Sequence, residues 1–151
     1  MVIRLATKVD KAKVLKLYNE LRDITEGKKT VISNEHRRRS EEIFRSVIER
    51  NDTHIFVAEE NNDLIGLATF YLLPNIKHGW LRGHIEDMIV TKSVRGKGVG
   101  SQLLNEIKKY CSKHDIKVIK LDSGRELKQA HQFYKKNDGK QTELMFRFDI
   151  K

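Results

Sequence analysis

The segment Val94–Ser101 constrains the fold most, because its glycines lie between an apolar run and an amphipathic helix pattern. The helix that follows leaves its first N–H groups without partners and directs the positive end of its dipole at the loop. Arg95 and Lys97 add two cations to the same loop. The glycines stand at alternate positions, where they permit positive φ values and close approach of a ligand: Gly96, Gly98 and Gly100. Together these features predict a binding site for a phosphate group.

Two common phosphate-binding motifs do not fit this segment. A P-loop would contain Gly-Lys-Ser or Gly-Lys-Thr, and neither tripeptide occurs in the chain. A dinucleotide-binding loop would need a third glycine where the chain has Ser101. The remaining pattern, Arg95-x-x-Gly98-x-Gly100, follows a strand-like run that carries Glu86 and Asp87. This arrangement resembles the acyl-CoA site of the GNAT superfamily of N-acetyltransferases.

A second motif supports the same resemblance. Residues 130–136 read Ala-His-Gln-Phe-Tyr-Lys-Lys, which is similar to the Ala-x-x-Phe-Tyr-x-Lys helix of that family. The resemblance extends from Asp63 to Gly139. The family usually continues with Lys-x-Gly-Phe, whereas this chain has no aromatic residue directly after Gly139. Residues 83–87 and 121–123 also resemble glucosamine-6-phosphate acetyltransferases.

The resemblance implies a fold class and an activity. The fold would be one α/β (α+β) domain over residues 1–151, with a central mixed, mostly antiparallel sheet of about six to seven strands and about four flanking helices. The activity would be acetyl transfer from acetyl-CoA, a co-substrate, to a primary amine by direct attack. The cofactor-binding residues would be Met88, Ile89, Val90, Arg95, Gly96, Lys97, Gly98, Val99, Gly100, Ser101 and His131.

Glu86 and Asp87 are the candidate general bases. Adjacent residues of a strand point to opposite faces of a sheet unless a bulge intervenes. An alkylammonium ion must lose a proton before its nitrogen can attack a thioester, so a nearby carboxylate has a clear task. We favour Glu86 as the base and Asp87 as a substrate-binding partner. The alternative is a solvated pair of acids at the end of the sheet.

Tyr134 is the candidate general acid. Its family counterpart donates a proton to, or hydrogen-bonds with, the departing CoA thiolate. A phenol with an ordinary pKa of about 10 is a reasonable match for a thiol leaving group near about 8.5. The alternative is a core aromatic residue beside Phe133.

Hydrophobic periodicity predicts the order of the elements. The expected strands are Val2–Ala6, His54–Glu60, Leu64–Leu73, His84–Val90, Val118–Asp122 and Leu144–Ile150. The expected helices begin near Asp10, Ser33, Gly98 and Leu127. Gly27-Lys28-Lys29 is expected to form a basic loop after the first helix. Pro74 is expected to close its strand, and residues 75–83 to form a loop.

Composition bounds the compartment and the partners. The net charge of +9 suits a polyanion such as CoA, a phosphorylated substrate or nucleic acid. A single cysteine, Cys111, excludes an internal disulfide and favours a reducing, cytoplasmic location, with Cys111 itself packed on an apolar helix face. The histidines are scattered, so no metal site is expected, and no apolar run is long enough to span a membrane.

The sequence leaves the acceptor open. A small amine or an amino sugar is favoured, and a protein lysine or N-terminus, a polyamine or an aminoglycoside is the alternative within the same chemistry. The alternative from another class is a non-catalytic nucleic-acid-binding module. Basic residues are spread along the chain without an aromatic stacking motif, so we expect no nucleic-acid partner. A homodimer is compatible with the sequence.

Overall fold

The computed structural model describes residues 1–151 except Lys28, Thr30 and Lys151. Lys28, in the basic loop predicted after the first helix, therefore lies outside the described residues. Backbone contacts divide the chain into two compact units, Met1–Lys120 and Leu121–Lys151. In the part of the chain that is described, no helix has the length and apolar character needed to cross a membrane.

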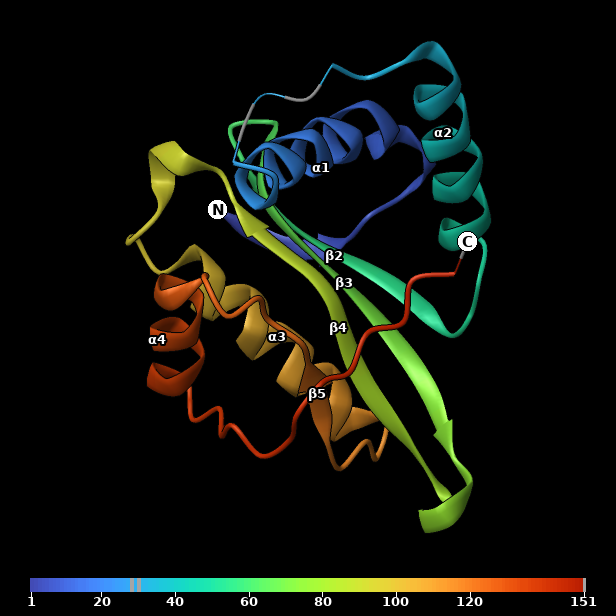
Figure 1. Cartoon of the computed structure of the whole chain (residues 1–151), viewed down its shortest axis with the longest axis vertical. Coiled ribbons are helices and arrows are strands. Elements are labelled where there is room, and N and C mark those ends of the chain that lie inside the picture. The colour runs from blue at the N-terminus through green and yellow to red at the C-terminus, as the bar shows by residue number, and fades with distance from the viewer. Residues whose placement is uncertain (28, 30, 151) are drawn as a thin grey trace. The chain divides into compact units, whose positions relative to one another are not determined.

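A central sheet organises the chain (Figure 1). It consists of β1 (Val2–Leu5), β2 (Thr53–Glu60), β3 (Asp63–Asn75), β4 (Trp80–Val90) and β5 (Ile119–Leu121). The strands lie in this order, and each neighbouring pair from β1 to β4 is antiparallel. β5 follows β4 through a helix, which is the connection that parallel neighbours require, so the sheet is mixed.

Helices cover both faces of this sheet. α1 (Lys11–Thr25) and α2 (Asn34–Ile48) lie on one face, and α3 (Val99–Lys113) lies on the other (Figure 1). α4 (Lys128–Lys136) belongs to the second unit. Short 3-10 turns precede α1, connect β3 to β4 and follow β4: Lys8–Asp10, Ile76–His78 and Lys92–Val94.

The core between the sheet and the first two helices follows from matched apolar periodicities. Val14 and Leu17 of α1 and Phe44 of α2 are buried against one set of strand residues. That set is Ile55, Val57, Leu64, Leu67 and Ile89. Each side chain of this size contributes about 1.5–3 kcal/mol on burial, so this layer fixes how α1 lies over β3 and β4.

α3 packs closely on the opposite face. The rings of Phe70 and Tyr110 meet edge to face, with their centroids 5.9 Å apart. A Cβ atom on Gly66 would lie 3.2 Å from Leu103 Cδ1, so the helix approaches the strand where it has no side chain. Residues 66 and 70 of β3 therefore face α3, and alternation directs Thr69 toward α1.

The buried carboxylate of Asp10 joins β1 to the start of α1. Asp10 is 3% exposed, and it accepts hydrogen bonds from Arg4 Nη1 at 2.8 Å and from Thr7 N at 2.8 Å. The Arg4 guanidinium holds the pKa of Asp10 well below its usual range. Asp10 precedes α1 as expected, but its side chain closes the preceding 3-10 turn rather than capping the helix.

The β3–β4 hairpin extends beyond the rest of the sheet. β2 pairs with β3 as far as Tyr71, whereas β3 and β4 remain paired to Asn75 and Trp80. The predicted loop over residues 75–83 is therefore wrong, because the pairing continues through most of it. Pro74 lies within the strand rather than closing it, and the missing N–H falls where β3 has one neighbouring strand.

The predicted strand Leu144–Ile150 is also wrong, and with five strands the sheet is smaller than expected. The alternating apolar residues that suggested it, Leu144, Phe146, Phe148 and Ile150, are all exposed. Alternation makes a segment able to form a strand, but a strand also needs a neighbouring backbone to accept its hydrogen bonds. The segment is extended coil in this structure.

Candidate active site

A bulge in β4 lies at the acidic pair. Thr69 of β3 is opposite Asp87, and the next residue, Phe70, is opposite Ile85. Glu86 is therefore the extra residue of β4 and has no partner on β3. The sequence pattern left two arrangements open, and the structure has the one with the bulge.

The bulge places both carboxylates on the face of the sheet that α1 covers. Asp87 is opposite Thr69, which faces α1. His84 is opposite Tyr71 on the same face, and its Nε2 lies 3.3 Å from Glu86 Oε2. Without the extra residue, Glu86 and Asp87 would point to opposite faces.

The two acids differ in their surroundings. The Glu86 side chain is 55% exposed, whereas Asp87 is half-buried. Burial raises the pKa of the Asp87 carboxyl, and the neighbouring Glu86 charge raises it further. A carboxylate held in this way binds a proton more readily than an exposed one.

Two tyrosines line the same face as the acids. The hydroxyl of Tyr18, on α1, forms a hydrogen bond with Thr69 Oγ1. Burial raises the pKa of both Tyr18 and Tyr71, and the charges of Glu86 and Asp87 act in the same direction. Both phenols are therefore neutral at pH 7 and provide polar groups beside the acids. The sequence indicated Tyr18 only as part of an apolar helix stripe, and no motif pointed to Thr69.

The glycine loop adopts the conformation that its sequence predicts. Gly96 has a φ of 78° and Gly98 a φ of 84°, values that side-chain-bearing residues rarely adopt. A Cβ atom at either position would meet nothing within 4 Å, so open space lies above the loop. α3 begins at Val99, immediately after Gly98.

The loop and the start of α3 together offer donors and positive charge to an anion. The first N–H groups of α3, at Val99, Gly100 and Ser101, precede the first intrahelical donors and surround the positive end of the helix dipole. Lys97 is exposed beside them. Arg95 is also exposed, but its Nε donates to the Val90 carbonyl at 2.9 Å, so the arginine is partly engaged with its own loop.

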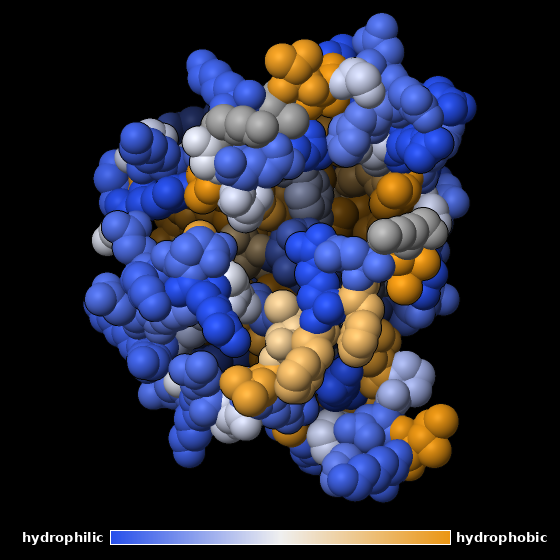
Figure 2. Space-filling model, in the orientation of Figure 1, coloured by the Kyte–Doolittle hydropathy of each residue, from blue (hydrophilic) through white to orange (hydrophobic). Residues whose placement is uncertain are grey.

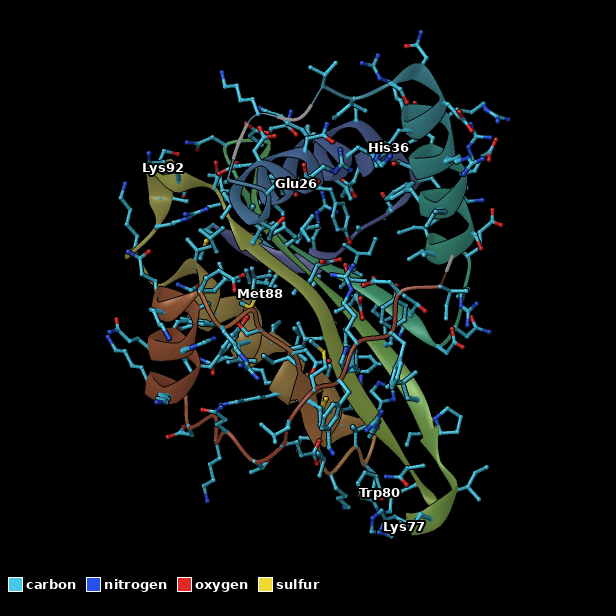
Figure 3. The ribbon with its side chains drawn as sticks, viewed as in Figure 1. Glu26, His36, Lys77, Trp80, Met88 and Lys92 are labelled. Carbon is cyan, nitrogen blue, oxygen red and sulfur yellow. The ribbon has the colours of Figure 1, made fainter. Side chains whose placement is uncertain are left out.

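β4 ends at Val90, and the 3-10 turn Lys92–Val94 connects it to this loop (Figure 3). Met88, Ile89 and Val90 pair with Ala68, Leu67 and Gly66 of β3. On the other side of β4, the Gly83 N–H donates to the Val118 carbonyl at 2.9 Å, just before β5. Residues 88–90 come after this contact along β4, on the side of the strand's end that leads to the glycine loop.

Glu20, on α1, was not indicated by any sequence pattern. Its carboxylate accepts hydrogen bonds from Thr91 Oγ1 at 2.8 Å and from Lys92 N at 2.9 Å. Arg95 Nη2 lies 3.9 Å from the same carboxylate. α1 therefore contacts both the face that carries the acids and the segment before the glycine loop.

His131 and Tyr134 lie on α4 in the second unit, where the Ala-x-x-Phe-Tyr motif forms a helix as expected. His131 Nε2 is 2.9 Å from the Gly124 carbonyl oxygen, so this nitrogen carries a proton and donates. The rings of Phe133 and Tyr134 meet edge to face with centroids 5.3 Å apart. Burial raises the pKa of Tyr134, which keeps its phenol protonated.

Cys111 is 4% exposed on α3, and burial raises the pKa of its thiol to about 11. It therefore packs as the sequence predicts and is a poor nucleophile. Among the described residues, no group of His, Cys, Asp or Glu is arranged to hold a metal ion.

Comparisons with known proteins identify a family. The model of the acetyltransferase (GNAT) family matches residues 14–139. The chain is 24% identical over 95 residues to aminoalkylphosphonate N-acetyltransferase of Salmonella typhimurium (strain LT2), covering 63% of this chain and 62% of that one. It is 32% identical over 100 residues to glucosamine 6-phosphate N-acetyltransferase of Trypanosoma brucei brucei, covering 65% of each. Both matches span less than two thirds of the relative's length.

The solved structures show the same fold. The aminoglycoside acetyltransferase meta-AAC0020 from an uncultured soil metagenomic sample, in complex with sisomicin, aligns with 99% of this chain and 96% of its own. The TM-score is 0.83 and the sequence identity is 18%.

Proposed function

Because the chain belongs to the acetyltransferase (GNAT) family, we propose that it transfers an acetyl group from acetyl-CoA to a small primary amine by direct attack. The proposal rests above all on the bulge in β4, which gathers Glu86 and Asp87 on one face. The same strand ends at the glycine loop, so it joins a proton acceptor to a phosphate-binding site.

The glycine loop is the proposed seat of the CoA diphosphate. The N–H groups that open α3 would donate to the phosphate oxygens, and Lys97 and Arg95 would add positive charge. The backbone of Met88, Ile89 and Val90 would line the arm of the cofactor that leads toward the acids. His131 stays a predicted cofactor contact from α4.

The acid pair is proposed to prepare the amine. When bound, acetyl-CoA supplies a thioester whose carbonyl carbon can accept the amine. Asp87, with its raised pKa, takes a proton from the ammonium group, which frees the nitrogen lone pair to form the new C–N bond. This proposal exchanges the two roles favoured from the sequence, Glu86 as base and Asp87 as substrate-binding partner, because Asp87 is the more buried of the two acids. Glu86, which is exposed, holds the ammonium group beside it. The C–S bond breaks as the product forms, and Tyr134 gives its proton to the departing sulfur. The nitrogen loses its second proton in the same step, and this proton restores the Tyr134 phenol.

A phosphate-bearing or phosphonate-bearing amine is the proposed acceptor. Two of the relatives act, by their names, on aminoalkylphosphonates and on glucosamine 6-phosphate. Both substrates combine an amine with a phosphorus oxyanion. The net charge of +9 suits an anionic substrate of this kind.

An amine screen with thiol release as the readout tests the function. Glucosamine 6-phosphate and 2-aminoethylphosphonate should release CoA thiol from acetyl-CoA faster than their matched partners without phosphorus, glucosamine and ethanolamine. A lysine-containing peptide tests the protein-acceptor alternative, and added DNA should change nothing. If the protein binds no CoA, the proposed acetyl transfer fails, and faster turnover of the amines without phosphorus would reject only the acceptor class.

A further inference from the structure

The segment between β4 and the glycine loop is held by a residue from a distant part of the chain. Glu20 of α1 accepts from Thr91 Oγ1 with one carboxylate oxygen and from the Lys92 N–H with the other, at 2.8 and 2.9 Å. The Arg95 guanidinium lies 3.9 Å from it. All three contacts fall between the end of β4 and the first glycine of the loop.

The Glu20 carboxylate caps the 3-10 turn that follows β4, although it belongs to a different element. Lys92 begins the 3-10 turn Lys92–Val94, and the preceding Thr91 makes no capping hydrogen bond with its own side chain. The first N–H groups of such a turn need an acceptor. Glu20 supplies one and also fixes the Thr91 hydroxyl. Thr91 N in turn donates to the Ile65 carbonyl at 2.9 Å, so the turn is anchored to β3 as well.

We propose that Glu20 is a positioning residue for the cofactor loop and determines how tightly the protein binds CoA. This inference rests on the proposed function of the glycine loop. A loop held in its binding conformation loses less conformational freedom when a ligand binds, and the affinity is correspondingly higher. Glu20 touches no ligand itself. It acts through Thr91, Lys92 and Arg95, whose positions set the path of the chain into Gly96.

Calorimetric titration with coenzyme A tests the proposal. Glu20→Ala removes both hydrogen bonds and should weaken CoA binding about tenfold. Glu20→Gln keeps one acceptor oxygen and should lower the affinity for coenzyme A about threefold. Thr91→Val, which removes only the hydroxyl donor, should lower this affinity by a similar factor. Glu42→Ala is the matched control, because Glu42 is a glutamate on α2 whose ion pair with Arg38 is exposed. It should leave the affinity unchanged.

Two further readouts separate positioning from general stability. The KM for acetyl-CoA should rise in Glu20→Ala while kcat at saturation stays near the parental value, and the melting temperature should match that of Glu42→Ala. Amide exchange at Lys92 should speed up in Glu20→Ala but not in the control. If folded Glu20→Ala and Thr91→Val variants both bind CoA as tightly as the parent protein, the role of Glu20 is overturned, while the proposed function stands. Absence of CoA binding in the parent protein would overturn the proposed function and this inference with it.

Discussion

At the residue scale, Glu86 and Asp87 are adjacent in sequence yet have different roles in the proposed chemistry. Asp87→Asn should lower the rate most near neutral pH and recover partly as the pH rises, because free amine then forms without a base. Since burial raises the pKa of Asp87, the parental rate should fall on acidification at a higher pH than an ordinary aspartate would give. Glu86→Gln should mainly raise the KM for the amine. A pH–rate profile of each variant measures both effects, and parental behaviour in Asp87→Asn would transfer the role of base to Glu86.

Tyr134 allows packing and proton donation to be separated by one atom. Tyr134→Phe keeps the ring beside Phe133, so the melting temperature should hardly change. If the phenol protonates the departing sulfur, kcat should fall by about 10²–10⁴-fold while the affinity for acetyl-CoA is retained. Steady-state kinetics and a melting curve suffice, and equal turnover would leave Tyr134 with a packing role alone.

Asp10 provides a stability test independent of catalysis. Asp10→Asn removes the charge that Arg4 pairs with and should lower the free energy of unfolding by about 2 kcal/mol at pH 7. Because the folded-state pKa of Asp10 is depressed, this stabilisation is complete above the unfolded pKa of about 3.9 and disappears as the pH falls below it. Urea denaturation at pH 7 and pH 3 should therefore show a difference that narrows in acid. Asp52→Asn, at the exposed pair with Arg50, should cost much less, because solvent screens that pair.

At the element scale, the loop that opens α3 has a matched control elsewhere in the chain. Gly98 and Gly79 both have positive φ, and a Cβ atom at either would meet nothing within 4 Å. Replacement by Asp should therefore cost each site a similar backbone strain of about 1–2 kcal/mol. Only Gly98→Asp places a carboxylate where the CoA diphosphate is proposed to lie, so only that variant should lose CoA affinity, by at least about 100-fold. Calorimetry measures the CoA affinity of both variants, and equal affinities would mean that this loop does not bind the diphosphate.

The sequence predicted those elements whose cause is local. Glycines followed by an apolar stripe gave the start of α3 at Val99, and polar residues between two apolar runs gave the β2–β3 hairpin. The bulge at Glu86 has no local signal, because it depends on how β4 aligns with β3. The contacts of Glu20 are likewise invisible in a sequence, since α1 and Lys92 meet only after the chain folds. The strand predicted over Leu144–Ile150 was wrong because a local alternation of apolar residues does not by itself provide a neighbouring strand to pair with.

At the scale of the whole molecule, the acid pair lies on β4, the glycine loop follows that strand after a 3-10 turn, and α1 contacts both regions. Tyr18 contacts Thr69 beside the acids, and Glu20 contacts the turn before the loop. The family fold predicted from the sequence provides this arrangement of sheet and helices. The side chains that link its parts became apparent only from the three-dimensional contacts.

The outer part of the β3–β4 hairpin has a further consequence. Among the described residues, the two strands have only each other as paired neighbours from Leu73 to Arg82, and Ile76 is 94% exposed. Figure 3 shows Lys77 and Trp80 at the tip of this hairpin, and Figure 2 shows hydrophobic surface (orange) there, at the lower right. A two-stranded ribbon is marginally stable in water, so this arm should open by local fluctuation without unfolding the core. Amide exchange should be fast at Leu81 and Trp80 and slow at Leu67 and Phe70 of the same hairpin. Within this hairpin, brief trypsin treatment of the native protein should accordingly cut first after Lys77, while uniform protection along the whole hairpin would mean that it opens only with the core.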